Sequence, residues 1–253
     1  MSLTTLTTDF GLRDYYLAAL KGSLITANPE ERLIDVTHEI GSHDIVKAAF
    51  VIKNIKHTFP KDTIHLIYVK NHESKQQLII FKKDDQYFIG PNNGLFSLVF
   101  ETIAEPKYSI EQASIDIPPF RIIAECIQAL RAGKALDEIG KPVEHFMERL
   151  NILPIVQQNQ IRASVIHIDT YGNVIVNVQK ELFERVRQNR PFKIFFKRTD
   201  PITKISNHYS DGKIGEPICV FNLSNYMVIA TMMGRAHQDL GLNKEETIQI
   251  LFG

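Results

Sequence analysis

A threonine-rich strand that ends in a carboxylate opens the chain and constrains what can follow it. Residues 4–8 read Thr-Thr-Leu-Thr-Thr, a β-branched run typical of a buried or half-buried strand. Asp9 stands where this strand ends, Gly11 permits a sharp turn, and Asp14 opens a predicted helix that reaches about residue 26. In an open α/β sheet, ligands bind at the carboxyl ends of the strands. The two carboxylates can therefore bind a pair of hydroxyls or an ammonium group, or they are structural, as a turn residue and a helix N-cap.

Strands and helices alternate through the first part of the chain. A strand–helix–strand–helix–strand order favours parallel pairing with right-handed crossovers. We therefore predict an α/β N-terminal domain over residues 1–154, with a mostly parallel sheet and Rossmann-like layers. Besides the opening strand and helix, the expected elements are strands over residues 33–36, 63–69, 77–82 and 87–89, a helix N-capped by Ser42, and helices over residues 95–101 and 119–132.

The second part, residues 155–253, contains closely spaced short strands with few helices between them. Such spacing is typical of a small antiparallel sheet or barrel, and it predicts a smaller all-β, barrel-like C-terminal domain. The boundary is placed at about residue 155 because residues 151–160 lose apolar periodicity. The expected strands cover residues 161–168, 174–178, 192–197, 217–221, 226–231 and 247–252, and short helices lie near residues 180–188 and 235–240.

Composition and missing motifs argue against several classes of function. The 29 basic and 29 acidic residues balance, so no overall positive field favours a nucleic-acid or membrane partner. No apolar run is long enough to span a bilayer and no signal segment precedes the first strand, which predicts a cytoplasmic protein. Phosphate-binding glycine loops, serine-hydrolase elbows and HExxH pairs do not occur. The two cysteines lie in apolar stretches without zinc spacing, so neither a metal site nor a cofactor is expected.

Three further polar clusters follow predicted strands. Since parallel strands share one carboxyl edge, the first two are expected on the same side of the sheet as Asp9. Solvated loops are polar in any case, so this convergence indicates a site only in combination with other features. The clusters are Thr37-His38-Glu39, residues 70–75 and residues 169–173.

The histidines in these segments have different expected roles. His38 and Glu39 point to opposite faces of an extended segment, so we expect a structural or exposed histidine more than an acid–base pair. His65 lies within a strand and is expected to pack in the core or at an edge. His72 and Glu73 are best placed for proton transfer, with an ordinary surface position as the alternative.

Five segments, in order along nearly the whole chain, carry recognisable motifs. They are residues 4–11 with Asp14, Tyr15 and residues 21–22; residues 35–40 with residues 44–45 and 48–49; residues 88–94; residues 168–174 with Asn177; and residues 215–217 with Asn222 and residues 229–230 and 241–242. Together they resemble the S-adenosyl-L-methionine (SAM) hydroxide adenosyltransferase family, relatives of the bacterial fluorinase and chlorinase. Asn92, in the glycine-proline turn, stands where this family usually has aspartate.

The resemblance implies a two-domain chain assembled as a homotrimer. SAM or adenosine would bind between the N-terminal domain of one subunit and the C-terminal domain of the next. By the same resemblance, Asp9 would bind the ribose hydroxyls and Asp14 the methionine ammonium, while Asp169 would assist with the ammonium and Asn173 would bind the adenine edge. The other implied substrate-binding residues are His43, at a position where the family often has an aromatic, Tyr171 or Tyr209 as a stacking partner of adenine, and Asn222.

The sequence departs from this family at its water-activating residues. Active hydrolases of the family carry an Asp-Pro-Gly-Val-Gly loop followed by an arginine, and a Phe-His-Gly-Arg-Asp stretch before the next helix. Here Lys70 stands at the aspartate position, a glutamine lies near the arginine position, and residues 115–121 contain no histidine. The chain therefore resembles a divergent member without the usual Asp/Arg/His triad. His72 or Glu73 as a base, with Lys70 steering an anion, are the candidate catalytic substitutes.

Two main functions remain open at this level. The first is hydrolysis of SAM to adenosine and methionine by attack of water or hydroxide on the ribose carbon next to the sulfonium. Because sulfonium is already a good leaving group, this reaction needs orientation and desolvation of the nucleophile more than acid assistance. The second is a catalytically silent SAM- or adenosine-binding protein that acts as a sensor or sink. A pocket that has changed to another nucleoside is a third possibility.

Overall fold

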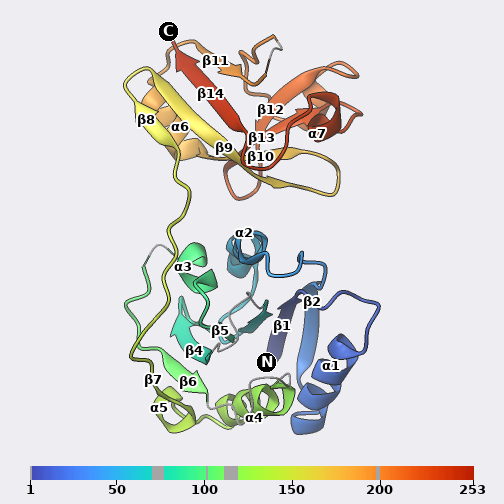
Figure 1. The fold of residues 1–253 in the computed structure, drawn as a ribbon, viewed down its shortest axis with the longest axis vertical. Coiled ribbons are helices and arrows are strands. Elements are labelled where there is room, and N and C mark those ends of the chain that lie inside the picture. The colour runs from blue at the N-terminus through green and yellow to red at the C-terminus, as the bar shows by residue number, and fades with distance from the viewer. Residues whose placement is uncertain (1, 70–76, 101, 111–118, 198–199) are drawn as a thin grey trace. The chain divides into compact units, whose positions relative to one another are not determined.

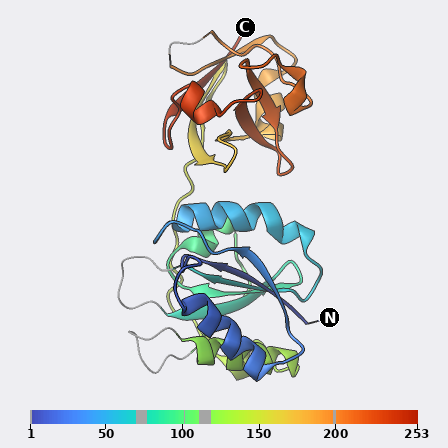
Figure 2. The ribbon, with the colours of Figure 1, turned by 90° about the vertical axis from the view of Figure 1, so that its right-hand side faces the viewer.

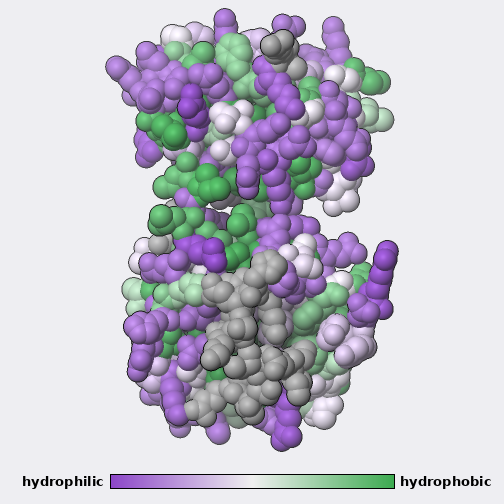
Figure 3. Space-filling view, viewed as in Figure 1, coloured by the Kyte–Doolittle hydropathy of each residue, from purple (hydrophilic) through white to green (hydrophobic). Residues whose placement is uncertain are grey.

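The protein is described from a computed structural model, which covers residues 2–69, 77–100, 102–110, 119–197 and 200–253 (Figure 1). The chain divides into two compact units, Met1–Leu150 and Asn151–Gly253. The expected two-domain architecture is thereby confirmed. None of the described helices is both long and apolar enough to cross a membrane. Figure 3 shows hydrophilic side chains over much of the visible surface of each unit.

The first unit is built on a seven-stranded sheet in the order β2-β1-β3-β5-β4-β6-β7. The first three pairings in this order are parallel and the last three are antiparallel. The expected mostly parallel sheet is therefore wrong, because the described sheet is mixed. The strands are β1 (Leu3–Thr8), β2 (Arg32–Thr37), β3 (Ile64–Tyr68), β4 (Leu78–Lys83), β5 (Gln86–Pro91), β6 (Tyr108–Ile110) and β7 (Lys141–Pro142).

A two-residue turn explains the change from parallel to antiparallel pairing. Asp84 and Asp85 connect β4 to β5, and both have positive φ angles, 51° and 59°. Two consecutive positive φ angles match the tight hairpin turns that join antiparallel strands. The strands β6 and β7 are only three and two residues long, too short to leave a periodic pattern in the sequence.

Helices cover both faces of this sheet (Figure 2). One core joins α1 and α4 to the sheet through residues such as Leu6, Leu24 and Ile123. A second core joins α2 and α3 to the sheet through residues such as Ile52 and Phe88. The helices are α1 (Tyr16–Ala27), α2 (Ile45–Ile55), α3 (Leu95–Val99), α4 (Phe120–Arg131) and α5 (Leu136–Ile139), with a short 3₁₀ helix at Lys56–Thr58.

The starts of α1 and α2 differ from expectation. The N-cap of α2 is Asp44, whose side chain accepts a hydrogen bond from the N–H of Lys47 at 2.8 Å, so the prediction of Ser42 was wrong. The N-cap of α1 is Tyr15, without a capping side-chain bond. Asp14 is therefore not the N-cap of α1, and this structural explanation of its carboxylate is wrong.

His65 is buried in the middle of the first unit, as expected. Its side chain is fully enclosed, with Nδ1 2.8 Å from Thr5 Oγ1 and Nε2 3.3 Å from Gln86 Oε1. The ring stacks on Phe88 at 5.0 Å between centroids. Burial, reinforced by the nearby charge of Lys56 and opposed by the Gln86 bond, lowers the pKa of His65 to about 4.

We expect this histidine to make stability depend on pH. As pH falls below about 6.5, the ordinary pKa of histidine, His65 is protonated in the unfolded chain. In the folded chain it stays neutral until about pH 4. The free energy of unfolding should therefore fall by roughly 2–4 kcal/mol across this interval. Urea unfolding of the wild type and of His65→Gln at several pH values measures the difference. An equal decline in both proteins would contradict this role for His65.

The second unit is a curled antiparallel sheet of the half-barrel type. The strand order is β11-β14-β9-β10-β13-β12, with β8 paired to β9. Isolated bridges from Ile202 to Ile194 and from Ile205 to Cys219 connect residues 202–205 to the strands at both ends of this path. The strands are β8 (Ile155–Gln157), β9 (Gln160–Ile168), β10 (Val174–Gln179), β11 (Phe192–Phe195), β12 (Pro217–Phe221), β13 (Tyr226–Thr231) and β14 (Thr247–Phe252).

Short helices and one edge strand complete this unit. Helix α6 (Lys180–Arg187) inserts Phe183 into the core, where its ring contacts Phe192 at 5.1 Å and Phe252 at 5.7 Å between centroids. The other helices are α7 (Ala236–Asp239) and a 3₁₀ helix at Tyr209–Asp211. Residues 151–160, which lack apolar periodicity, contain β8. All three residues of β8 are exposed, and a strand without a buried face does not require alternating apolar residues.

Candidate functional site

The carboxyl edge of the parallel strands brings Asp9 and His43 together. Asp9 follows β1 directly, and the loop after β2 returns to it. The backbone N–H of His43 donates to Asp9 Oδ2 at 3.3 Å. His43 has a φ angle of 65°, an uncommon conformation for a residue other than glycine. This turn of the backbone aims an N–H group at the carboxylate, and it places both residues where the sequence predicted a ligand site.

Aromatic rings line the same edge behind Asp9. Phe10 lies 5.8 Å from Tyr16, 5.5 Å from Tyr68 and 5.7 Å from Phe120, measured between ring centroids. Burial and the neighbouring Asp9 charge raise the pKa of Tyr68. These rings were not predicted as part of a site, although Tyr68 at the end of β3 and Phe10 directly after Asp9 could have indicated them.

Asp14 lies on the exposed loop that leads from this edge into α1. Leu12 and Tyr15 on the same loop expose 66% and 70% of their surface. Large apolar side chains on both sides of a carboxylate form a surface suited to a ligand with a charged end and an apolar body. Asp9, Asp14 and His43 are called the N-terminal half-site below.

Asn92 and Asn93, in the turn directly after β5, contact the residues on either side of the segment 70–76. Asn93 is completely buried, and its Nδ2 donates to the carbonyl of Val69 at 2.8 Å. The backbone N–H of Asn92 donates to the carbonyl of Gln77, also at 2.8 Å. The described residues on either side of the segment, Val69 and Gln77, are therefore both attached to this turn.

The side chain of Asn92 uses both its donor and its acceptor. Its Nδ2 donates to the carbonyl of His145 at 2.8 Å, and its Oδ1 accepts from the N–H of Met147 at 2.8 Å. A carboxylate could make only the second bond. Asn92 therefore serves to attach residues 145–147 to the sheet.

The three expected catalytic residues all lie in a segment that the structure does not describe. Lys70, His72 and Glu73 lie outside the described residues, and so do residues 111–118, which include part of the stretch without histidine. Their roles stay predictions.

A second polar cluster lies in the turn between β9 and β10. The backbone N–H and the Nδ2 of Asn173 donate to Oδ1 and Oδ2 of Asp169, both at 2.9 Å. The carboxylate thereby orients the Asn173 amide, whose carbonyl oxygen is an acceptor on the same side chain. Burial and the charge of Asp169 raise the pKa of Tyr209, while Tyr171 at the turn is 79% exposed. Asp169, Tyr171, Asn173 and Tyr209 are called the C-terminal half-site below.

Asn222 lies apart from these residues. Its Oδ1 accepts from the N–H groups of Ser224 and Tyr226, at 3.0 and 2.9 Å, within the turn between β12 and β13. The register pairs Tyr226 with Gln179 and Ile229 with Val174, so Asn222 and the C-terminal half-site lie at opposite ends of β10 and β13. A six-residue strand is roughly 17–20 Å long. Within this unit the Asn222 side chain stabilises a turn, and its role in substrate binding stays a prediction.

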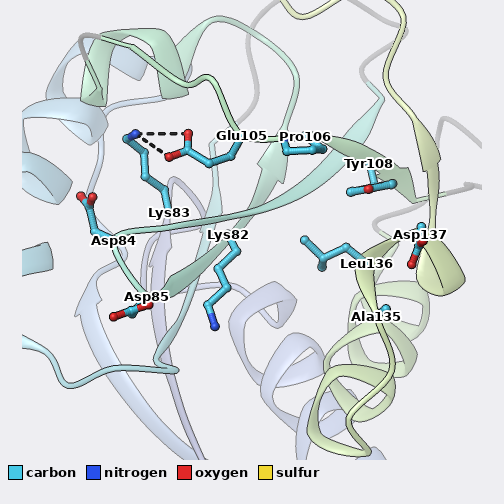
Figure 4. A pocket seen from close by; sticks show the side chains of 10 residues that line it. All are labelled: Lys82, Lys83, Asp84, Asp85, Glu105, Pro106, Tyr108, Ala135, Leu136 and Asp137. Atoms are coloured by element: carbon cyan, nitrogen blue, oxygen red, sulfur yellow. Dashed lines mark hydrogen bonds and ion pairs between the residues drawn. The ribbon is translucent and has the colours of Figure 1, made fainter.

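A separate hollow of about 520 Å³ lies at the opposite edge of the first sheet (Figure 4). The turn between β4 and β5 lines this hollow. The turn lies at the amino end of β5, which runs parallel to β1, so the hollow is at the end of the sheet opposite to Asp9. Lys83 forms an ion pair with Glu105 at 2.9 Å, and Asp85 forms one with Lys61 at 2.6 Å. These charged groups pair with one another at the protein surface, and the hollow is distinct from the N-terminal half-site. Across the described ranges, no three His, Cys, Asp or Glu side chains converge as a metal site would require.

Family models match the two units separately. Residues 4–140 match the N-terminal domain of SAM hydroxide adenosyltransferases, and residues 163–249 match the C-terminal domain. The chain belongs to the SAM hydroxide adenosyltransferase family. The resemblance drawn from the motifs is thereby confirmed, and each half-site falls within one matched region.

Individual relatives extend over nearly the whole chain. An (R)-S-adenosyl-L-methionine hydrolase of Methanocaldococcus jannaschii is 24% identical over 100% of this chain and 97% of its own length. A fluorinase of Nocardia brasiliensis is 20% identical over 97% of this chain and 95% of its own. A crystal structure of a conserved protein from Thermotoga maritima covers 99% of this chain and 100% of its own with a TM-score of 0.87, at 24% identity. This family member therefore shares its fold across both units.

Proposed function

We propose that this protein hydrolyses SAM to adenosine and methionine. Water or hydroxide would attack the ribose C5′ carbon, forming a C–O bond as the C–S bond breaks. The electron pair of that bond goes to sulfur, which turns the sulfonium into the neutral thioether of methionine, and the water loses a proton to a base. The full-length similarity to an (R)-S-adenosyl-L-methionine hydrolase carries this proposal.

The polar side chains of the two half-sites suit the adenine, the ribose hydroxyls and the methionine ammonium of SAM. In the proposal, Asp9 accepts hydrogen bonds from the ribose hydroxyls, and Asp14 and Asp169 bind the methionine ammonium. Asn173 binds the adenine edge, and Tyr171 or Tyr209 stacks on the base. His43 is the remaining substrate-binding residue of the proposal. The fixed orientation of the Asn173 amide by Asp169 supports its proposed role, since an oriented amide discriminates between purine edges.

The base is proposed to lie in the segment 70–76. His72 or Glu73 would take the proton, and Lys70 would attract hydroxide by its charge. Neither a metal nor a cofactor has a part in this proposal. The good leaving group makes orientation of water the main requirement, which a substituted loop can meet.

Incubation with SAM in water enriched in heavy oxygen tests this function. Adenosine that carries the heavy oxygen at its 5′ position is the expected product, detected by chromatography and mass spectrometry. His72→Ala and Glu73→Ala should slow its formation, whereas Ser74→Ala in the same loop should not. Tight binding without product would favour the silent sensor instead. Failure to bind SAM or adenosine at millimolar concentration would contradict both functions.

We further propose a homotrimer in which each site combines the N-terminal half-site of one subunit with the C-terminal half-site of its neighbour. Asp9→Ala and Asp169→Ala should each be inactive. Their co-expression in equal amounts should restore about a quarter of wild-type activity, because each mixed trimer regains one intact site. Light scattering should give a mass three times the 28.9 kDa of the chain. No recovery in proven mixed trimers would exclude sites shared in this way.

A further inference from the structure

His38 contacts the Asp9 turn from two sides. Its side chain is only 4% exposed, and its Nδ1 lies 2.9 Å from Thr8 Oγ1, directly before Asp9. Its backbone carbonyl accepts the N–H of Gly11 at 2.7 Å, two residues after Asp9. One residue therefore fixes the backbone on both sides of the carboxylate.

The second nitrogen of His38 lies near an ion pair. Nε2 lies 3.1 Å from Asp35 Oδ1, without the geometry of a hydrogen bond, and Asp35 Oδ2 accepts from Lys21 Nζ at 2.6 Å. The hydrogen bond of His38 to the strand end is therefore the one between Nδ1 and Thr8 Oγ1. Thr8 Oγ1 also accepts the N–H of Phe10 at 3.4 Å, so this bond links His38 to the residue directly after Asp9.

The segment that begins at His38 also contacts the Asp9 carboxylate itself. The loop continues to His43, whose backbone N–H donates to Asp9 Oδ2. Three contacts from one short stretch of chain thus hold the strand end, the carboxylate and the turn. His38 and Thr8 are both buried, so their hydrogen bond supports the end of β1 directly before Asp9 from within the protein.

We propose that His38 is a positioning residue for Asp9, and that it sets how well this protein recognises the ribose diol. The inference rests on the proposed function only in taking Asp9 as the ligand of the diol. His38 touches no substrate in this arrangement. It acts through Thr8 and Gly11, and its effect should be specific to ligands that carry both ribose hydroxyls.

Calorimetric binding of adenosine and of 2′,3′-dideoxyadenosine tests this specificity. His38→Ala should weaken adenosine binding by about tenfold, the order of one lost hydrogen bond, and dideoxyadenosine binding by much less. Thr8→Val, which removes only the hydroxyl, should give the same pattern. His38→Asn places an amide oxygen near the position of Nδ1 and should recover part of the loss. His57→Ala, at an exposed histidine, should change neither affinity.

A double-mutant cycle separates positioning from general damage. If His38 acts through Asp9, His38→Ala should have little further effect on adenosine binding in an Asp9→Ala background. Additive losses, or equal losses for both nucleosides, would overturn the proposal.

A measurement on the ligand-free protein distinguishes this inference from the proposed function. Hydrogen exchange of the Phe10 amide, which Thr8 Oγ1 accepts, should accelerate in His38→Ala and Thr8→Val. Unchanged exchange would overturn the positioning role even if SAM is hydrolysed. Faster exchange in a protein that binds neither nucleoside would support the positioning role and refute the proposed function alone.

Discussion

Asp9→Asn should lower kcat/KM for SAM by roughly 100- to 10,000-fold, if two hydroxyls each lose a hydrogen bond to a charged group worth about 1.5–3 kcal/mol. Asparagine keeps the shape of aspartate, and its oxygen can still accept the N–H of His43. The loss should therefore come from the missing charge and from an amide N–H that now faces a hydroxyl. Initial rates of adenosine formation across a range of SAM concentrations give kcat and KM separately.

The position of the loss within the kinetic constants is informative. A higher KM with unchanged kcat would mean that Asp9 binds substrate and transition state equally. A lower kcat would mean that Asp9 binds the transition state, in which the C–S bond is breaking, more strongly than it binds SAM. Asp137→Asn, at an exposed carboxylate on α5, is the matched control and should leave both constants unchanged. A change of less than threefold in Asp9→Asn would contradict the assignment of Asp9 to the ribose.

Glu31→Ala should destabilise the first unit by about 3–5 kcal/mol, the usual effect of removing one partner from a buried ion pair. The Glu31 side chain is 1% exposed, and its two oxygens accept from Arg131 Nη2 and Nε at 2.7 and 3.0 Å. Thr4 Oγ1 and Asn28 Nδ2 donate to the same carboxylate at 2.8 and 3.0 Å. The alanine variant leaves the guanidinium and both polar groups without this acceptor.

Urea unfolding at neutral pH measures this effect. Glu30→Ala, at the exposed neighbouring carboxylate, should change the free energy of unfolding by less than about 0.5 kcal/mol. The double variant Glu31→Leu with Arg131→Met should recover much of the loss, because it removes both charges together. A loss below about 1 kcal/mol in Glu31→Ala would show that water or another group replaces the carboxylate.

Periodicity predicted the long elements well and the short ones poorly. The helix that carries Ile52 was expected from its apolar face, the opening strand from its β-branched run, and the six main strands of the second unit from their close spacing. The strand β7 covers only two residues, which no period can reveal. The N-cap of α2 was misplaced by two residues because Ser42 and Asp44 are both good caps and only the backbone path selects between them.

The residues of the candidate site that directly follow a strand could be predicted from the sequence, whereas the contacts that loops make with them could not. Asp9 was singled out from its place after β1. Its contact with His43 depends on a positive φ angle that the sequence does not encode in any simple way. His38 was expected to be structural or exposed, and its link to Thr8 depends on the pairing of β1 with β2. The C-terminal half-site followed from family resemblance, since spacing alone gave no reason to join Tyr209 with Asp169.

The two asparagines after β5 attach the residues on either side of one segment to the end of that strand. Asn93 and Asn92 attach to Val69 and Gln77, the residues on either side of the segment 70–76. Substitutions inside that segment leave these attachments untouched, because both are made to main-chain carbonyls. Transplanting the same seven positions from a relative should therefore keep both attachments, which makes this segment a direct target for redesign.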